Sequence, residues 1–113
     1  MGIKGFKAFS KDMKCKDFQF EIGKEYEEKE AICCQKGFHL VTNPLDLLNY
    51  YDLCQSEFCE VEALGSVDKN KKDSKLATTK IKIGAKLGLP GFIKASIDFL
   101  LEVTKLPKGE KPA

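Results

Sequence analysis

The chain has 113 residues, of which 42% are hydrophobic and 32% charged, and a formal net charge of +2. A chain of this size builds one core, so we expect a single compact domain over residues 1–104 and a flexible C-terminal tail over 105–113. No apolar run approaches the roughly 18 residues of a membrane span, and the N-terminus lacks the apolar stretch of a secretory signal. These features favour a cytoplasmic protein that does not enter membranes.

Two features of the charged and titratable residues exclude further classes. All nineteen basic residues are lysine, so the chain lacks the guanidinium forks that read guanine edges. We therefore expect no sequence-specific binding of nucleic acid. His39 is the only histidine, which excludes zinc hydrolase motifs built on paired histidines.

The hydrophobic pattern predicts an α+β domain. Apolar alternation and turn signals indicate strands at 3–9, 18–22, 31–34, 38–41, 57–64 and 79–83, with an exposed loop at 66–75. Asn43 as a cap and Pro44 at the first position predict a helix to about residue 53. A second helix with a broad apolar stripe follows 88–91 and runs to about Val103. Because the strands are joined by short hairpin-like links, we expect a mainly antiparallel sheet with two helices.

The cysteines suggest a metal site. Two pairs share one spacing, Cys34-x4-His39 and Cys54-x4-Cys59, and each pair spans a turn between elements. Thiolates and an imidazole suit tetrahedral zinc, and three cysteines with one histidine close the shell of a structural site. The sequence therefore predicts a structural zinc ion held by these four residues.

Two other interpretations of the cysteines stay open. Cys59 shares a strand face with Val61 and Ala63, so the cysteines can equally be small buried core residues. A Cys34 and His39 dyad is the enzymatic alternative, with the imidazole lowering the thiol pKa. Cys15 is the natural substitute if Cys34 or Cys54 belongs to the core.

Lysines cluster in the second half of the chain and suggest a partner-binding surface. If the loop at 66–75 and the following strand lie on one face, their side chains form a basic patch that contacts an acidic partner. The predicted partner-binding residues are Lys69, Lys71, Lys72, Lys75, Lys80 and Lys82. Solvated lysines that only guard a strand edge are the alternative. An acidic stretch at 21–30 is the opposite candidate surface, and Tyr50 and Tyr51 are candidate anchors.

Several segments together resemble a family of small phage and prophage accessory proteins. They are residues 5–9, 15–26, 34–39, 43–46 and 49–51, and the resemblance extends over about residues 3–97. Small phage genes of this kind commonly encode proteins that block host defences, and some anti-CRISPR proteins that act on Cas9 are compact α+β domains of this size. The resemblance thus implies a non-enzymatic inhibitor of a host protein, with Cas9 as the first candidate. It would act by occlusion or by locking a conformation.

Two other functions remain open at this point. The order of 37–39, the helix at 45–53 and the strand at 57–64 also looks like part of an ADP-ribosyltransferase core, although the arginine usual in that fold has no counterpart here. A phage structural or packaging accessory protein is the other alternative, and such a protein is expected to self-associate symmetrically. The sequence leaves the oligomeric state open.

Overall fold

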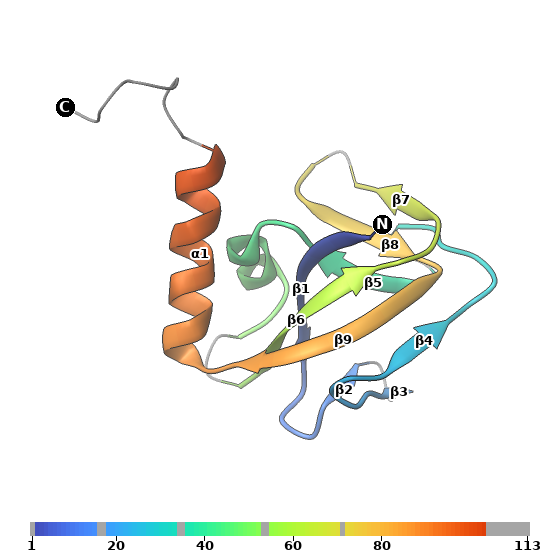
Figure 1. Cartoon of the computed structure of the whole chain (residues 1–113), viewed down its shortest axis with the longest axis horizontal. Coiled ribbons are helices and arrows are strands. Elements are labelled where there is room, and N and C mark those ends of the chain that lie inside the picture. The colour runs from blue at the N-terminus through green and yellow to red at the C-terminus, as the bar shows by residue number, and fades with distance from the viewer. Residues whose placement is uncertain (1, 16–17, 34–35, 53–54, 71, 104–113) are drawn as a thin grey trace.

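A computed structural model describes residues 2–15, 18–33, 36–52, 55–70 and 72–103 (Figure 1). The strands are β1 (Ile3–Phe9), β2 (Lys14–Cys15), β3 (Phe18–Gln19), β4 (Glu25–Glu27), β5 (Phe38–Val41), β6 (Glu57–Ala63), β7 (Val67–Lys69), β8 (Lys75–Thr78) and β9 (Lys80–Leu87). The helices are the 3-10 helix η1 (Pro44–Asn49) and the α-helix α1 (Leu89–Val103). Seven strands form an antiparallel sheet in the order β4-β9-β6-β1-β5-β8-β7, and β2 pairs with β3. The predicted α+β class, with its mainly antiparallel sheet and two helices, is confirmed.

The sheet curls because two of its strand pairs form one bent hairpin. β6 pairs with β9 and β7 pairs with β8. Hydrogen bonds continue through the bend, from Leu64 N to Lys80 O at 2.8 Å and from Thr79 N to Ser66 O at 3.0 Å. β8 then pairs with β5, β5 with β1, and β1 with β6. The order of pairing therefore runs from β9 through β6, β1 and β5 to β8, the strand that directly precedes β9 in the chain. This return gives the sheet the curvature of a small barrel.

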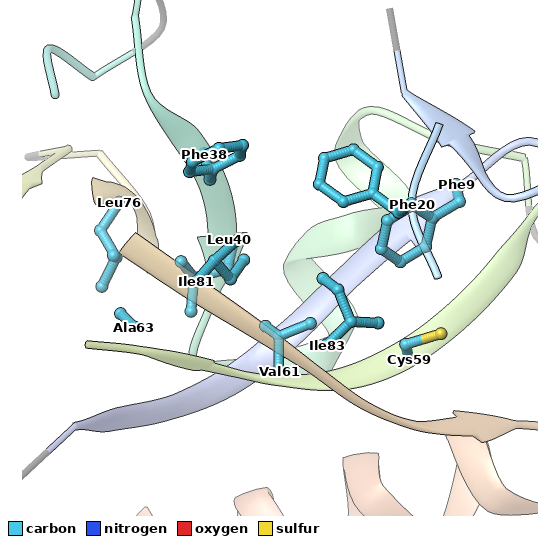
Figure 2. Packing of buried hydrophobic residues seen from close by; sticks show 10 residues of the cluster. All are labelled: Phe9, Phe20, Phe38, Leu40, Cys59, Val61, Ala63, Leu76, Ile81 and Ile83. Carbon is cyan, nitrogen blue, oxygen red and sulfur yellow. The ribbon is translucent and has the colours of Figure 1, made fainter. Parts of the chain in front are cut away.

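The inside of this curled sheet holds the main core (Figure 2). We call it the barrel core, and its buried residues are Phe9, Phe20, Phe38, Leu40, Cys59, Val61, Ala63, Leu76, Ile81 and Ile83. The period-two pattern explains its composition, since alternate residues of β1, β6 and β9 point to the same face. Each fully buried Leu or Ile here contributes roughly 1.5 to 3 kcal/mol relative to an exposed one.

The outer face of the sheet carries a second cluster that holds the helices. Its buried residues are Ala8, Val41, Leu47, Phe58 and Phe92. Leu47 comes from η1 and Phe92 from α1, and the rings of Phe92 and Phe58 lie 4.6 Å apart. The Asn43 side chain accepts a hydrogen bond from Leu45 N at 3.1 Å, as expected for the helix cap. Among the described residues, no helix is both long and apolar enough to cross a bilayer.

Some predicted elements are shorter than expected or differ in type. The helix predicted to reach about residue 53 is a 3-10 helix that ends at Asn49. The strand predicted at 18–22 covers only Phe18–Gln19, and Ile22 is exposed rather than sharing a buried face with Phe20. The predicted flexible tail, 105–113, lies outside the described residues.

Two predictions were wrong because they considered neighbours in sequence only. In the described part of the strand predicted at 31–34, only Ile32 pairs, in one bridge with Lys36, and β5 pairs with β1 and β8. The segment predicted as an exposed loop, 66–75, contains β7. All three β7 side chains are exposed, so the strand depends on backbone pairing with β8 and leaves no hydrophobic signal.

Candidate binding cleft around Lys7

Lys7 is a buried cation at the point where two strands of the sheet part. β1 forms seven ladder pairs with β6 but a single one with β5, Phe6 with Val41. Beyond that pair, the Lys7 ammonium donates a hydrogen bond to the backbone oxygen of His39 at 2.7 Å. The residue is only 4% exposed. A side chain thus bridges β1 and β5 where the ladder does not continue.

Aromatic rings surround this lysine. The Lys7 Nζ lies 5.8 Å from the ring centre of Phe9 and 5.7 Å from that of Phe20, within the range of a cation and π interaction. Phe20 also makes edge contacts with Phe18 at 4.6 Å, and its ring centre lies 6.0 Å from that of Phe38. The rings come from β1, the β2–β3 hairpin and β5, so residues distant in sequence build one aromatic wall.

An open cleft of about 760 Å³ lies against this wall. Its lining residues are Lys7, Cys15, Phe18, Phe20, Glu28, Lys29, Glu30, Lys36, Gly37, Phe38, His39, Tyr51 and Lys75. We refer to it as the aromatic cleft. Four of these residues are lysines and two are glutamates, so the lining carries an excess of positive charge.

The two glutamates of the cleft have partners within the protein. Glu30 pairs with Lys36 at 3.2 Å. Glu28 accepts a hydrogen bond from the backbone N–H of Gly37 at 2.9 Å. Gly37 itself has φ +88°, a conformation that glycine adopts without strain, and it begins the turn into β5. These contacts fix the acidic side chains at the rim of the cleft.

Tyr51 forms another part of the cleft lining and is kept neutral. Its hydroxyl lies 4.0 Å from the sulfur of Cys15. Burial, with a smaller contribution from the neighbouring Cys15 thiol, raises the pKa of Tyr51 to about 12. At neutral pH the phenol is therefore an uncharged hydrogen-bonding group next to the lysines. Tyr51 was predicted as an anchor for a partner, and the structure places it in the cleft.

The predicted zinc ligands are only partly described, and the two described ones are not brought together. Cys34 and Cys54 lie outside the described residues. Cys59 is fully buried in the barrel core with Leu40 (Figure 2). His39 precedes Leu40 on β5, and the alternation of a strand therefore directs it to the opposite face of the sheet. In the described part of the chain, no three His, Cys, Asp or Glu side chains form a group that could hold a metal ion.

The described lysines of the predicted patch form two parts, on the β7–β8 hairpin and on β9, which follows β8 directly in the chain. Lys69, Lys72 and Lys75 lie on or beside the β7–β8 hairpin, at one end of the sheet order, and Lys71 lies outside the described residues. Lys80 and Lys82 lie on β9, next to the other end of the order. On β9, Lys80 and Lys82 lie opposite the glutamates of β4.

Acidic residues accompany both parts of the patch. Lys80 pairs with Glu25 at 3.4 Å, and Lys82 is opposite Glu25 in the ladder. On the hairpin, a hydrogen bond from the Tyr50 hydroxyl is the main cause that lowers the pKa of Asp73, which therefore carries a negative charge at neutral pH. Of the five predicted lysines that the structure describes, only Lys75 lines the aromatic cleft, and its Nζ lies 4.2 Å from the ring centre of Tyr50.

Lys7 was not among the functional residues expected from the sequence. A signal was present, because Lys7 occupies an inward position of β1 in register with Ile3 and Phe9. A lysine at an apolar position of an alternating strand indicates a buried charge, which proteins keep at a cost in stability.

The fold and the cleft define a single α+β domain with a curled antiparallel sheet and an open aromatic cleft that has a buried lysine in its lining. The chain belongs to the DUF7666 family, described as a domain of unknown function, whose model matches residues 3–95. No curated protein and no solved structure matches the chain.

We expect the stability of the protein to fall between about pH 9 and pH 11 in part because of Cys59. Burial raises the pKa of the Cys59 thiol from 9.0 to about 11, so folding favours the neutral thiol. This contribution is complete below pH 9 and is lost as the pH rises through 11; two pKa units correspond to roughly 2 to 3 kcal/mol. Urea unfolding followed by circular dichroism should show a flatter pH profile for Cys59→Ala than for the wild type.

Cys33→Ala is the matched control for this measurement, because Cys33 lies outside the barrel core. It should retain the wild-type slope. Equal slopes for the wild type and Cys59→Ala would contradict the assignment.

The structural zinc ion stays a prediction, and native mass spectrometry of protein purified without chelator tests it. If Cys34, His39, Cys54 and Cys59 hold zinc, the mass exceeds that of the chain by one zinc ion. His39→Ala then loses the excess mass, because removing one of four ligands weakens the site strongly. Metal retained in both His39→Ala and Cys59→Ser rules out this ligand set.

Proposed function

We propose that the protein is a non-enzymatic binding protein whose aromatic cleft takes an acidic, aromatic segment of a partner protein. One observation carries the proposal: a lysine that is only 4% exposed lines an aromatic cleft of about 760 Å³. Charge and apolar surface are combined at one place, which is the composition of a recognition site.

The charge of the cleft favours a negatively charged ligand. The four lysines Lys7, Lys29, Lys36 and Lys75 outnumber Glu28 and Glu30 in the lining. An ammonium group in a partly desolvated site attracts a carboxylate more strongly than one in bulk water, because the effective dielectric constant is lower. A carboxylate that reaches toward Lys7 and the rim lysines matches this distribution.

The aromatic wall favours an apolar side chain next to the carboxylate. Phe18 is 46% exposed although it makes ring contacts with Phe20 and Tyr26 at 4.6 and 5.4 Å. Its exposed part provides an edge and a face for a partner ring at little entropic cost, since the neighbouring rings already hold it. A peptide segment that alternates acidic and aromatic residues fits both surfaces.

The target follows from the resemblance of the sequence to phage accessory proteins. Two of the segments that carry this resemblance, 5–9 and 34–39, contain Lys7 and His39, which are joined by a hydrogen bond in the structure. On the ground of this resemblance, the proposed protein is a phage-encoded inhibitor that binds a host defence protein in the bacterial cytoplasm. Cas9 is the first candidate, blocked by occlusion or by locking of a conformation.

Removal of the buried charge tests the cleft. Lys7→Met keeps an unbranched side chain and removes the ammonium group. On an array of hexapeptides that vary acidic and aromatic residues independently, we expect the wild type to prefer peptides containing both. Fluorescence anisotropy with the best peptide should show roughly tenfold to hundredfold weaker binding by Lys7→Met, since bonds to charged groups are worth about 1.5 to 3 kcal/mol.

Lys24→Met is the matched control, because Lys24 is exposed and does not line the cleft. It should bind as the wild type does. Thermal unfolding of Lys7→Met should occur at or above the wild-type temperature, because burial of a charge opposes folding. No preference for acidic peptides, or equal binding by wild type and Lys7→Met, would overturn the proposed cleft function.

A nuclease assay tests the target separately. Purified protein should abolish DNA cleavage by a Cas9 nuclease at a near-stoichiometric ratio, whereas the Lys7→Met variant should require roughly tenfold more protein. Inhibition that is absent across several Cas9 orthologues removes Cas9 as the target. Inhibition that Lys7→Met retains in full shows that another surface makes the contact.

A further inference from the structure

Two of the lysines that line the aromatic cleft lie together at one end of it. Four residues line both the cleft and a small cavity of about 10 Å³ that reaches η1, namely Lys7, His39, Tyr51 and Lys75. They are therefore neighbours, and we call them the basic end of the cleft. Neither of the two glutamates of the cleft lines this cavity. The basic end thus combines two ammonium groups and a phenol.

The two glutamates of the cleft lie away from the basic end. Glu28 and Lys29 also line a separate hollow next to Thr79, at the bend of the sheet. Glu30 pairs with Lys36 at 3.2 Å. Among the described residues that line the cleft, four are lysines and two are glutamates, so the excess of two positive charges lies at the basic end.

Tyr51 adds a neutral hydrogen-bond donor to the basic end. Its pKa of about 12 keeps the hydroxyl protonated at neutral pH. The sulfur of Cys15, at 4.0 Å, is a weak acceptor, so the hydroxyl can turn toward an oxygen of a ligand without losing a strong bond. Asp73 lies near this end, but it accepts a hydrogen bond from the Tyr50 hydroxyl at 2.6 Å and does not line the cleft. The donors of the basic end therefore suit an anion with several oxygens.

Lys7 connects the basic end with the aromatic wall. Its Nζ lies 5.7 Å from the ring centre of Phe20, and the Phe20 ring lies 4.6 Å from that of Phe18. A ligand ring that packs against these two rings is therefore close to the Lys7 ammonium group. An acidic group carried by that ring requires one ordered side chain, whereas a separate acidic residue requires two. Each side chain that is ordered on binding costs conformational entropy, so a single residue with both features is favoured.

We propose that the aromatic cleft binds a phosphorylated tyrosine of the partner segment, with the ring on the aromatic wall and the phosphoryl group at the basic end. This inference rests on the proposed function and specifies the acidic group of its ligand. A phosphoryl group carries about 1.5 to 2 negative charges at neutral pH and has three acceptor oxygens. It matches the two ammonium groups of Lys7 and Lys75 and the hydroxyl of Tyr51. A carboxylate has one charge and two oxygens, and so leaves one of these groups without a partner in the ligand.

The shape of the cleft favours a phosphotyrosine within a protein chain. The cleft is open and has a volume of about 760 Å³, so residues that flank the phosphotyrosine also have room. Lys29 and the exposed part of Phe18 are available to contact them. A nucleotide likewise combines a ring with a phosphoryl group, but a sugar separates the two, whereas Lys7 lies directly beside the aromatic wall.

Fluorescence anisotropy of the full chain with one hexapeptide in three forms tests the proposal. The peptide carries glutamates around a central residue, which is tyrosine, sulfotyrosine or phosphotyrosine. The phosphotyrosine form should bind roughly tenfold to hundredfold more tightly than the tyrosine form, because the phosphoryl group adds charge-assisted hydrogen bonds. Sulfotyrosine has a similar shape and a smaller charge, so its affinity should lie between the two.

The outcomes separate this inference from the proposed function. If the tyrosine form binds and phosphorylation does not strengthen binding, the inference is overturned and the proposed function stands. Equal affinities of the sulfated and phosphorylated forms also overturn it, since a second charge then has no effect. If none of the forms binds, both fail. AMP that binds more tightly than the phosphotyrosine peptide would replace the protein partner by a nucleotide and overturn the assignment.

Variants at the two ends of the cleft locate the phosphoryl group. Lys75→Met should reduce the preference for phosphotyrosine over tyrosine roughly tenfold, because it removes one of the two ammonium groups at the basic end. Lys29→Met is the matched control, since it removes the same charge from the lining of the same cleft away from that end. It should keep the preference within roughly twofold. Equal losses in both variants would show a general effect of charge and overturn the placement.

Tyr51→Phe tests the neutral donor of the basic end. It removes only the hydroxyl, so the ring still lines the cleft. The variant should bind the phosphotyrosine peptide roughly threefold to tenfold more weakly and the tyrosine peptide as the wild type does, because one hydrogen bond to the phosphoryl group is lost. An unchanged affinity for the phosphotyrosine peptide excludes Tyr51 from the site and overturns the proposed match of three donors.

Discussion

The bend between β6–β7 and β8–β9 determines the rest of the architecture. The chain pairs these segments on both sides of the bend, through the hydrogen bonds of Leu64 and Thr79, and the bend carries β8 back to β5. A flat sheet would leave one face of the β9 and β8 residues in solvent. The curled sheet instead encloses Leu76, Ile81 and Ile83, each no more than 2% exposed. The core, the position of the helices and the separation of β1 from β5 all follow from this curvature.

The cleft is a consequence of incomplete closure. β1 and β5 share one ladder pair, and the ammonium group of Lys7 connects them where no further pair forms. The β2–β3 hairpin then places Phe18 and Phe20 next to this opening, so a partner can approach a cation that the fold otherwise covers. The same lysine therefore spans the gap between β1 and β5, at the cost of a buried charge, and provides the charge that the proposed ligand requires. Met at this position would keep the packing and lose the recognition, which is why stability and binding are expected to respond in different directions.

Local patterns predicted the parts of this structure that depend on neighbours in sequence. The alternation of 3–9 and 57–64 corresponds to β1 and β6, and the capping signals at Asn43 and Pro44 mark the start of η1. Long-range pairing was not predictable in the same way. The spacing Cys34-x4-His39 does not show which face of the sheet a side chain occupies. His39 lies on β5 and Cys59 on β6, and β1 separates these two strands. The spacing therefore could not show that His39 and Cys59 point in opposite directions. The cleft was missed for the same reason, because its lining comes from strands that are not consecutive.

The two strands at the ends of the sheet order also affect how copies of the protein meet. β4 carries Glu25 and Glu27, and β7 carries Asp68 and Lys69, with both strands only three residues long. Short edges with charged side chains are poor templates for further strand addition, since each added strand would bury unpaired charge. At high concentration in a crowded cell, these two edges therefore protect the chain from edge-to-edge aggregation into extended β assemblies.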